Sequence, residues 1–165
     1  MSKVIEHARR EYPLESCGIL AGKNGKITKV YPMENTEKSS SSYLMAPEQQ
    51  LRVFREVEEE GLELSAIYHS HPHSPAFPSQ RDVDHAFYPD SLLLIISLMD
   101  QEAPQIGSFH IENGKIEQKG VKIKGKNALE NILYFQIQIE DLHLKFCIFE
   151  EAIKNKSSGT TPCLT

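Results

Sequence analysis

The sequence predicts a mixed α/β or α+β fold, in which helices flank a central β-sheet of mixed strand direction. Two short apolar runs, residues 17–22 and 91–99, are typical of buried strands. Two Asn-Gly pairs, Asn24-Gly25 and Asn113-Gly114, indicate tight hairpin turns toward both ends of the patterned region. Segments with helix signals separate these strands, at residues 2–12, 47–60 and 79–87.

The first helix and the first hairpin follow from local signals near the N-terminus. Ser2 suits the cap of a helix that reaches about Tyr12, because Pro13 stops it. Residues 17–22 and 27–33 then pair as a hairpin, since the Asn-Gly turn between them accepts positive φ at both central positions.

A second helix is predicted after a polar stretch, residues 37–42, which is expected to form a mobile loop. Pro47 suits the first turn of this helix, which should extend to about Glu60. Three apolar residues recur at helical spacing and are expected to face the core: Leu51, Phe54 and Val57.

The centre of the chain is predicted to hold a strand, a stiff loop and a short helix. Residues 64–68 form a strand that leads into His69. Three prolines within residues 72–78 favour a loop without regular hydrogen bonding. Ser79 then opens a helix to about Phe87.

Three further strands are predicted, of which the apolar run 91–99 is the central one. Residues 106–112 and 115–124 alternate in polarity and form a hairpin around Asn113-Gly114.

Beyond Gly125 the pattern does not decide between helix and strand. Residues 134–140 alternate like a strand, whereas Leu129, Ile132 and Leu133 suit a helix. We therefore divide the chain into a main domain, a C-terminal extension of undetermined structure and a disordered tail rich in Ser and Thr. These parts span residues 1–124, 125–156 and 157–165.

Composition and charge point away from several functional classes. The 165 residues suit one domain with a short appendage, and their net charge is −5. That acidic balance opposes nucleic-acid binding, whose affinity comes largely from cationic contacts. No Gly-rich phosphate loop is present, and no apolar run approaches the roughly 18 residues of a membrane span.

Cysteine usage predicts a reduced environment. Cys17, Cys147 and Cys163 are too sparse and too widely spaced for a disulfide framework, and no C-x-x-C pair indicates a thiolate zinc site. The charged N-terminus lacks the apolar stretch of a secretory signal. We therefore expect a cytoplasmic protein with no membrane or nucleic-acid partner.

The segment from His69 to Asp82 carries the chemistry. Strand residues two apart project from the same face, so His69 and His71 present their imidazoles side by side. Asp82 follows eleven residues after His71, one turn into a helix, where its carboxylate can return to the strand end. Two imidazoles and one carboxylate suit tetrahedral Zn²⁺ and leave one position open for a water.

A zinc hydrolase also needs a general base that is not itself a ligand. A bound zinc ion lowers the pKa of its water toward roughly 7, so the base works near neutral pH. Glu15 stands just before the strand at 17–22, where a carboxylate could lean over a neighbouring strand end.

These residues resemble the motif of the JAMM/MPN+ zinc metallopeptidase family. The family pattern is a Glu followed by H-x-H-P-x(6)-S-x-x-D, and Glu15, His69-Ser70-His71-Pro72 and Ser79-Gln80-Arg81-Asp82 match it in order and spacing. The stretch Pro13 to Gly22, P-x-E-x-C-G-x-L-x-G, looks like the compact prokaryotic branch. The similarity covers about residues 1–122.

The resemblance implies an MPN/JAMM fold with cytidine-deaminase-like layering and one Zn²⁺ per chain. It implies that His69, His71 and Asp82 hold the metal, while Glu15 moves the proton from the attacking water to the leaving amine. Ser79 would donate a hydrogen bond to the developing oxyanion. The implied substrate is the C-terminal, diglycine-type tail of a ubiquitin-like or sulfur-carrier protein, cut at a peptide or isopeptide bond.

Other interpretations of the same residues stay open. Ser79 and Asp82 also fit a helix capping box. His73 and His85 are interpreted as non-ligands, and Cys17 as a buried, inert thiol rather than a nucleophile. The rival functions are a non-catalytic MPN scaffold and a zinc amidohydrolase acting on small molecules. Whether the chain forms a homodimer also stays open.

Overall fold

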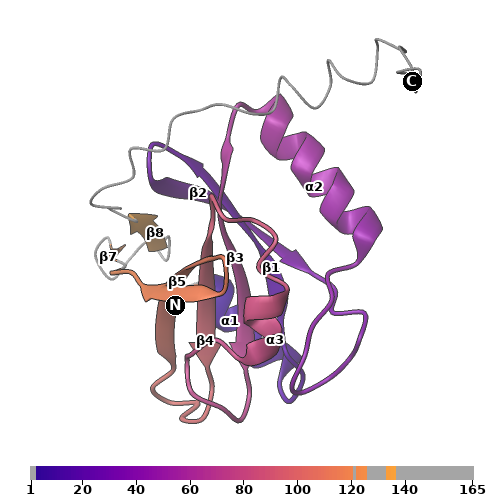
Figure 1. The fold of residues 1–165 in the computed structure, drawn as a ribbon, viewed down its shortest axis with the longest axis vertical. Helices are drawn as coiled ribbons and strands as arrows, with labels where there is room; N and C mark the ends of the chain where they lie inside the picture. Colours follow the sequence, from indigo (N-terminus) through magenta and orange to yellow (C-terminus); the bar gives the residue numbers. More distant parts are fainter. Residues whose placement is uncertain (1–2, 121, 126–132, 137–165) are drawn as a thin grey trace, which may run out of the picture.

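The computed structural model of the chain describes residues 3–120, 122–125 and 133–136. Figure 1 follows the chain through helices and strands that are intermixed along the sequence, as an α/β or α+β fold requires. The elements are α1 (Lys3–Glu11), β1 (Cys17–Lys23), β2 (Lys26–Met33), α2 (Pro47–Glu59), β3 (Glu63–His71), α3 (Gln80–Asp84), β4 (Leu92–Ser97), β5 (Gln105–Glu112), β6 (Lys115–Gln118), β7 (Lys122–Gly125) and β8 (Leu133–Gln136).

The described strands form one mixed sheet in the order β6-β5-β4-β3-β1-β2-β8-β7. Strand β3 lies at its centre and pairs antiparallel to β1 and parallel to β4. The parallel β3–β4 pair requires a crossover, and the proline-rich segment with α3 provides it. The functional residues of β3 therefore stand at the end of a strand that is held on both edges.

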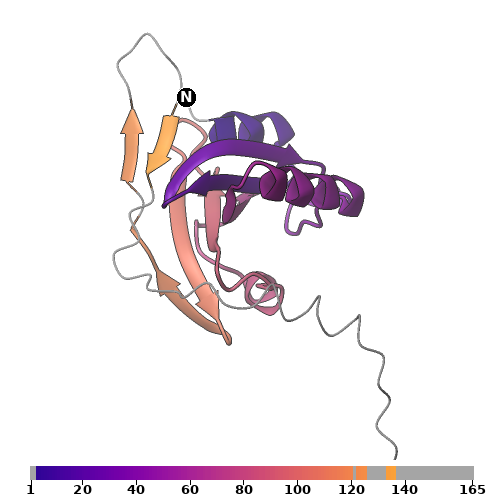
Figure 2. The same cartoon turned by 90° about the horizontal axis from the view of Figure 1, so that it is seen from above.

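Helices cover both faces of the sheet, as predicted, so the fold has a helical layer on each side of the strands (Figure 2). On one face, Val4 and Ala8 of α1 pack with Tyr68 of β3 in a cluster of buried residues. On the other face, Val53 and Val57 of α2 pack against Ile67 and its neighbours. Alternate residues of β3 thus serve opposite cores, as the period of a strand dictates.

Both predicted hairpins are confirmed. Asn24 and Gly25 have φ of 53° and 70°, and Asn113 and Gly114 have φ of 52° and 76°. These positive values are those a type I′ turn needs at its two central positions.

Gly18 allows β1 to pass close to the aromatic core. A Cβ atom at Gly18 would lie 2.4 Å from the Tyr31 carbonyl oxygen and 2.5 Å from the Tyr68 ring. The glycine is therefore needed, because a larger residue would push β1 away from its neighbours. Such a shift would also move Glu15, which lies just before this strand.

The prediction that Leu51 faces the core is wrong. Its exposed fraction is 53%, whereas Val53 and Val57 are buried and Phe54 is partly buried against the same cluster. The buried stripe is centred between Val53 and Phe54, and Leu51 lies about 110° around the helix from that centre. The other two predicted core residues of α2 are confirmed.

Two predicted element boundaries are also wrong. The helix opened by Ser79 ends at Asp84 rather than near Phe87. The predicted strand 115–124 is two strands, β6 and β7, which lie at opposite edges of the sheet and are separated at Lys119-Gly120. Gly120 has no side chain to pack against the sheet and gains more conformational freedom than other residues outside it, which favours the end of β6 near this position.

Some predictions lie outside the described residues, among them the Ser2 cap, the interpretation of Leu129, Ile132, Cys147 and Cys163, and the tail at 157–165. Within the extension predicted at 125–156, Leu133–Gln136 forms β8, which pairs with β7 and meets β2 at Lys26. The sequence did not decide between helix and strand for residues 134–140, and the described residues of that stretch, 134–136, lie in this strand. No helix among the described residues is long and apolar enough to cross a membrane.

Candidate metal centre

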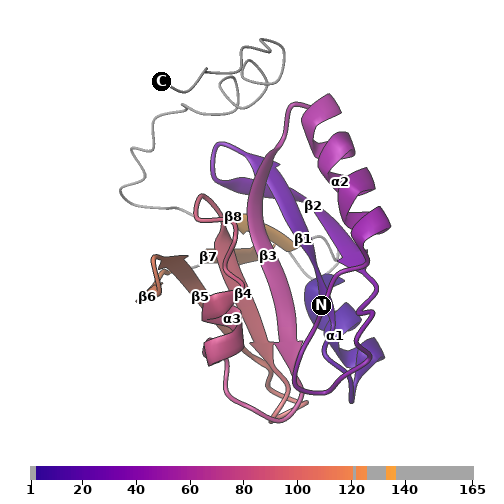
Figure 3. The same cartoon turned by 45° about the vertical axis from the view of Figure 1, so that its right-hand side comes forward.

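The end of β3 brings two histidines to one face of the sheet. His69 is fully buried and His71 is 5% exposed, and their register partners on β4 are Ile95 and Ser97. Because the residues are two apart on a strand, both rings point to the side that carries α3, which lies over β4 in Figure 3. The predicted pairing of the two imidazoles is confirmed in position.

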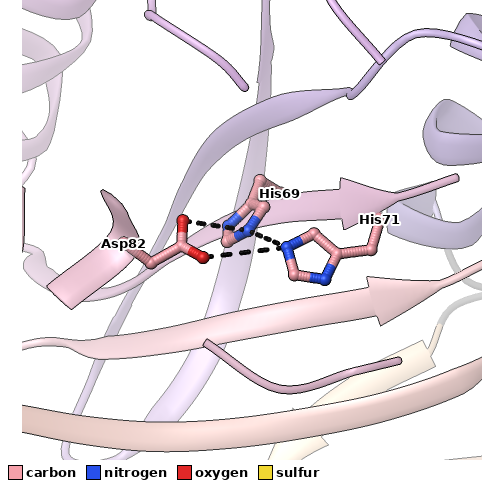
Figure 4. Close-up of side chains that lie close together, drawn as sticks. All are labelled: His69, His71 and Asp82. Carbon is pink, nitrogen blue, oxygen red and sulfur yellow. Dashed lines mark hydrogen bonds and ion pairs between the residues drawn. The ribbon is translucent and has the colours of Figure 1, made fainter. Parts of the chain in front are cut away.

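Three potential ligand atoms converge at this point (Figure 4). The Nε2 atoms of His69 and His71 lie 3.0 Å apart. Asp82 places Oδ1 at 3.3 Å from Nε2 of His69 and Oδ2 at 3.7 Å from Nε2 of His71. In a tetrahedral zinc site with bonds of about 2.0–2.1 Å, ligand atoms lie about 3.3 Å from one another. The measured separations lie around that value, with the two to Asp82 made by its two different oxygens, so the chemistry and placement of the three side chains suit a zinc ion.

Contacts around the two rings set which nitrogen faces the centre. Nδ1 of His71 donates a hydrogen bond to the Pro75 carbonyl oxygen at 2.8 Å, which leaves the Nε2 lone pair directed at His69 and Asp82. Nδ1 of His69 is buried and has no hydrogen-bond partner among the described residues. Burial lowers the pKa of His69, which favours the neutral imidazole that metals bind.

Asp82 is held by the start of α3. Ser79 is the N-cap, and its hydroxyl accepts from the Asp82 backbone N–H at 3.2 Å. In return, Oδ2 of Asp82 accepts from the Ser79 backbone N–H and hydroxyl, each at 2.7 Å. The capping box is confirmed, and it aims Oδ1 of the same carboxylate at His69.

The carboxyl of Asp82 stays ionised in this setting. Burial opposes ionisation, but the contacts with His69 and His71 outweigh it and hold the pKa of Asp82 well below its ordinary value. A charged carboxylate beside two imidazoles is a donor set that suits a divalent cation.

Glu15 lies at the entrance of β1, beside the centre but outside the group of converging ligand atoms. Its side chain is 4% exposed. Burial raises the pKa of Glu15 to about 7, the nearby His71 opposes that rise, and the Asp82 charge adds to it. A carboxyl whose pKa lies near neutral pH can both accept and return a proton.

The segment after Glu15 is tied to the histidine strand by two buried serines. The Ser16 backbone N–H donates to Oγ of Ser70 at 2.8 Å, and the Ser16 hydroxyl donates to the same oxygen at 3.1 Å. The Ser70 backbone N–H donates to the Ser16 carbonyl oxygen at 2.9 Å. Ser70, which lies between the two histidines, is thus a local hydrogen-bonding group on the opposite face, and it fixes the spacing between β3 and Glu15.

Sequence reasoning missed two residues that contact this centre. The Tyr43 ring stacks on His69 with ring centroids 4.7 Å apart and planes 24° from parallel. Asn35 donates from Nδ2 to the Glu15 carbonyl oxygen at 3.0 Å. Neither residue belongs to a periodic pattern, and both flank the polar stretch expected to be a mobile loop, so nothing local marks them.

The residues interpreted as bystanders lie outside the converging group. His73 packs its ring against Tyr12, and His85 caps the end of α3. Cys17 is fully buried, and burial raises the pKa of its thiol to about 12, which makes the thiolate scarce at neutral pH.

Comparisons with known proteins agree with this geometry. A family model described as prokaryotic homologues of the JAB domain matches residues 1–111. The solution structure of a protein from Desulfitobacterium hafniense matches with a TM-score of 0.63 and 34% identity, covering 70% of this chain and 82% of that chain.

Two relatives carry functional names. The CysO-cysteine peptidase of Mycobacterium tuberculosis is 34% identical over 125 residues, which cover 74% of this chain and 86% of that protein. The probable TtuB-protein conjugate cleaving protease of Thermus thermophilus is 43% identical over 81 residues, which cover 48% of this chain and 54% of that protein.

Proposed function

The chain belongs to the family of prokaryotic JAB-domain homologues, and from this membership we propose that it is a zinc-dependent peptidase or isopeptidase. Its substrate is the C-terminal tail of a ubiquitin-like or sulfur-carrier protein, and the bond cleaved follows that tail. The observation that carries the proposal is the convergence of His69, His71 and Asp82 beside the buried carboxyl of Glu15.

The substrate class is supported by the names of the relatives. One is named as a peptidase that acts on a CysO-cysteine substrate, and the other as a protease that cleaves TtuB-protein conjugates. Both names describe cleavage of a bond that joins two parts of a conjugate. We infer the same class of bond for this chain, without assigning the carrier or choosing between peptide and isopeptide.

His69, His71 and Asp82 would hold the metal, through Nε2 of each ring and a carboxylate oxygen. When bound, zinc supplies a Lewis acid that polarises the scissile carbonyl and makes a water acidic enough to attack near neutral pH. The chain contributes the fixed geometry, because β3 is paired on both edges and the capping box holds Asp82.

Glu15 acts as the general base and then as the general acid. Its carboxylate accepts a proton from the attacking water, and the resulting carboxylic acid donates that proton to the leaving amine. A pKa raised to about 7 by burial serves both directions, since neither protonation state is strongly preferred at neutral pH.

Ser79 stabilises charge at the reacting centre in this proposal. Its hydroxyl donates to Asp82 in the structure, so donation to an oxyanion requires the hydroxyl to rotate away from the carboxylate. The Asp82 carboxylate keeps the Ser79 backbone N–H when this happens, and its orientation is preserved.

We assign the catalytic activity to residues 1–124, which contain every residue of the proposed site. A cytoplasmic location remains a prediction from sequence. The roles of the extension at 125–156 and of any homodimer are left open.

The test of the proposal compares Glu15→Gln with Glu34→Gln, the same change at an exposed position. Each protein is assayed for zinc content and for cleavage of a carrier protein whose diglycine tail is joined to a C-terminal residue or to a lysine side chain. We expect Glu15→Gln to keep its zinc and lose about 10³-fold in kcat, because only the base is removed. Glu34→Gln should behave like the wild type.

Normal turnover by Glu15→Gln would contradict the proposed role of the base. A zinc-loaded wild type that cleaves neither substrate would favour the scaffold, whereas hydrolysis of small amides alone would favour an amidohydrolase.

A further inference from the structure

One loop contacts the proposed site at three places although it contributes no ligand and no base. We call residues 34–46, which connect β2 to α2, the 34–46 loop. Within it, the Ser39 carbonyl oxygen accepts the Glu15 backbone N–H at 2.8 Å, and the Tyr43 ring stacks on His69.

The third contact reaches the helix that carries Asp82. The Glu37 carboxylate of the 34–46 loop forms an ion pair with Arg81, the residue directly before Asp82. The loop therefore contacts the base, one proposed ligand and the neighbour of another, which lie in the segment before β1, in β3 and in α3. Sequence-distant parts of the site are joined through this loop as well as through the sheet.

A single side chain closes the loop. Asn35 donates from Nδ2 to the carbonyl oxygens of Glu15 and Ser42, both at 3.0 Å. Its Oδ1 accepts the backbone N–H groups of Glu37 and Leu44, both at 3.1 Å. Both amide hydrogens of Asn35 are used, and its carbonyl oxygen accepts two bonds, so the hydrogen-bonding capacity of the side chain is filled.

The consequence is that both backbone polar groups of Glu15 are bound by the loop. The Glu15 N–H is bound by Ser39 and its carbonyl oxygen by Asn35. Strand β1 begins only at Cys17, so sheet pairing does not fix Glu15 itself. The next residue, Ser16, is hydrogen-bonded to Ser70 of β3. The main chain at Glu15 is therefore held between the 34–46 loop and β3.

We propose that Asn35 is a positioning residue of the site, which folds the 34–46 loop so that the loop holds Glu15 at its working distance from the metal. This inference rests on the proposed function, because it takes Glu15 as the base. Without the Asn35 side chain, two carbonyl oxygens and two N–H groups lose their shared partner, and only the Ser39 bond is left of the two bonds between the loop and the Glu15 main chain. A displacement of about 1 Å at such a group costs on the order of 10²-fold in rate.

The first variant to test is Asn35→Ala in the full-length protein. We expect kcat to fall about 10-fold to 10²-fold, with KM and zinc content close to those of the wild type, because the tail-binding surface and the ligands are untouched. A second readout does not use activity. Amide hydrogen exchange, measured by NMR on the metal-free protein, should become at least about 10-fold faster at Glu15 while the Ile95 amide in the centre of the sheet stays protected.

Two further variants separate positioning from general weakening of the loop. Thr36→Val removes the Thr36 hydroxyl bond to the Leu44 carbonyl oxygen at the neck of the same loop, yet the Asn35 side chain keeps its four hydrogen bonds, including the one to Glu15. We expect its kcat to stay within about 2-fold of the wild type, since the donor to Glu15 remains. Asn35→Asp keeps the size and one acceptor oxygen but loses the two donated bonds, so it should lose as much kcat as the alanine variant.

An Asn35→Ala variant with unchanged kcat, or with unchanged exchange at Glu15, would overturn the inference. So would an equal loss of kcat in Thr36→Val, which would mean that the loop acts only through its stability. If the zinc-loaded wild type cleaves no conjugate, the proposed function fails, and the exchange at Glu15 still decides whether Asn35 holds that residue. If Asn35→Ala does not fold, Asn35→Asp is measured in the same two assays.

Discussion

Buried histidines occur on both faces of the sheet, and they differ in how their nitrogens are used. His7 on α1 is 3% exposed; its Nδ1 lies 2.8 Å from the Tyr68 hydroxyl and its Nε2 lies 3.7 Å from the Glu11 carboxylate. His69 is next to Tyr68 in β3 but points to the other face, where its Nε2 meets that of His71. Two residues that are neighbours on one strand therefore belong to two different kinds of polar cluster.

The difference lies in whether the fold itself completes the cluster. Nδ1 of His7 is hydrogen-bonded to the Tyr68 hydroxyl, so this buried pair is closed, in the sense that its members bind each other, and it stabilises the packing of α1. At the other face, the Nε2 atoms of His69 and His71 and the Asp82 carboxylate converge as potential metal ligands, and we call these three side chains the open cluster. A buried pair whose members bind each other indicates a structural role, whereas potential ligand atoms that converge from three side chains indicate a metal-binding site.

The largest expected effect comes from removing the charge at the open cluster. Asp82→Asn should lose most of its bound zinc and at least about 10³-fold in activity, because a neutral amide is a poor ligand and its NH₂ group can face a histidine. Metal analysis and conjugate cleavage measure both effects. Asp84→Asn, on the same helix but outside the converging group, is the matched control. A fully metallated and active Asp82→Asn would count against the ligand role.

The next effect separates catalysis from capping at Ser79. Ser79→Ala should lower kcat by about 10²–10³ if the hydroxyl stabilises the oxyanion. Loss of the N-cap should also lower the free energy of unfolding by about 1 kcal/mol. Steady-state kinetics and denaturant unfolding measure the two separately, and a loss of stability with unchanged kcat would leave Ser79 as a cap alone.

The third effect is a dependence of stability on pH at Glu15. The folded-state pKa of Glu15 is about 7 and its ordinary value is 4.5, so the folded protein holds this proton more tightly than the unfolded chain does. Stability is therefore lost as pH rises from about 4.5 to 7, and ionised Glu15 costs about 3 kcal/mol by pH 8.

Glu15→Gln should remove that cost in the metal-free protein. The free energy of unfolding of the variant minus that of the wild type should be about 3 kcal/mol larger at pH 8 than at pH 4. Denaturant unfolding at the two pH values measures the gain. A difference between variant and wild type that is the same at both pH values would show that Glu15 is not strained by its burial.

The smallest effect belongs to the closed pair. Tyr68→Phe removes the hydroxyl that meets His7 and leaves a buried ring nitrogen without its partner, which should lower the free energy of unfolding by about 1–2 kcal/mol. Zinc content and kcat should not change, because the substitution lies on the other face of β3. A loss of zinc in this variant would mean that the two clusters are coupled through the strand.

The parts of the fold that the sequence predicted are those determined by local chemistry. Asn24-Gly25 and Asn113-Gly114 specify their turns, and Pro47 specifies the start of α2. His69 and His71 could be paired from strand periodicity alone. Each of these features is determined by a few residues that are neighbours in the sequence, so it can be predicted without knowledge of the tertiary structure.

The parts that the sequence did not predict depend on tertiary contacts. The outward position of Leu51 follows from where the sheet meets α2, which helical spacing does not specify. The contacts of Asn35 with Glu15 and of Tyr43 with His69 join residues 20 and 26 positions apart, through single side chains in an irregular loop. No periodicity or turn rule marks such residues, although one of them closes the loop that holds the proposed base.

The central claim is that this open cluster binds zinc and that cleavage depends on it. The most direct test is metal analysis of the purified wild-type protein, followed by cleavage of a diglycine-linked carrier conjugate before chelation, after chelation and after zinc is restored. We predict about one zinc per chain, with cleavage lost on chelation and recovered with zinc. Absence of zinc binding, or cleavage that survives complete removal of the metal, would contradict the account.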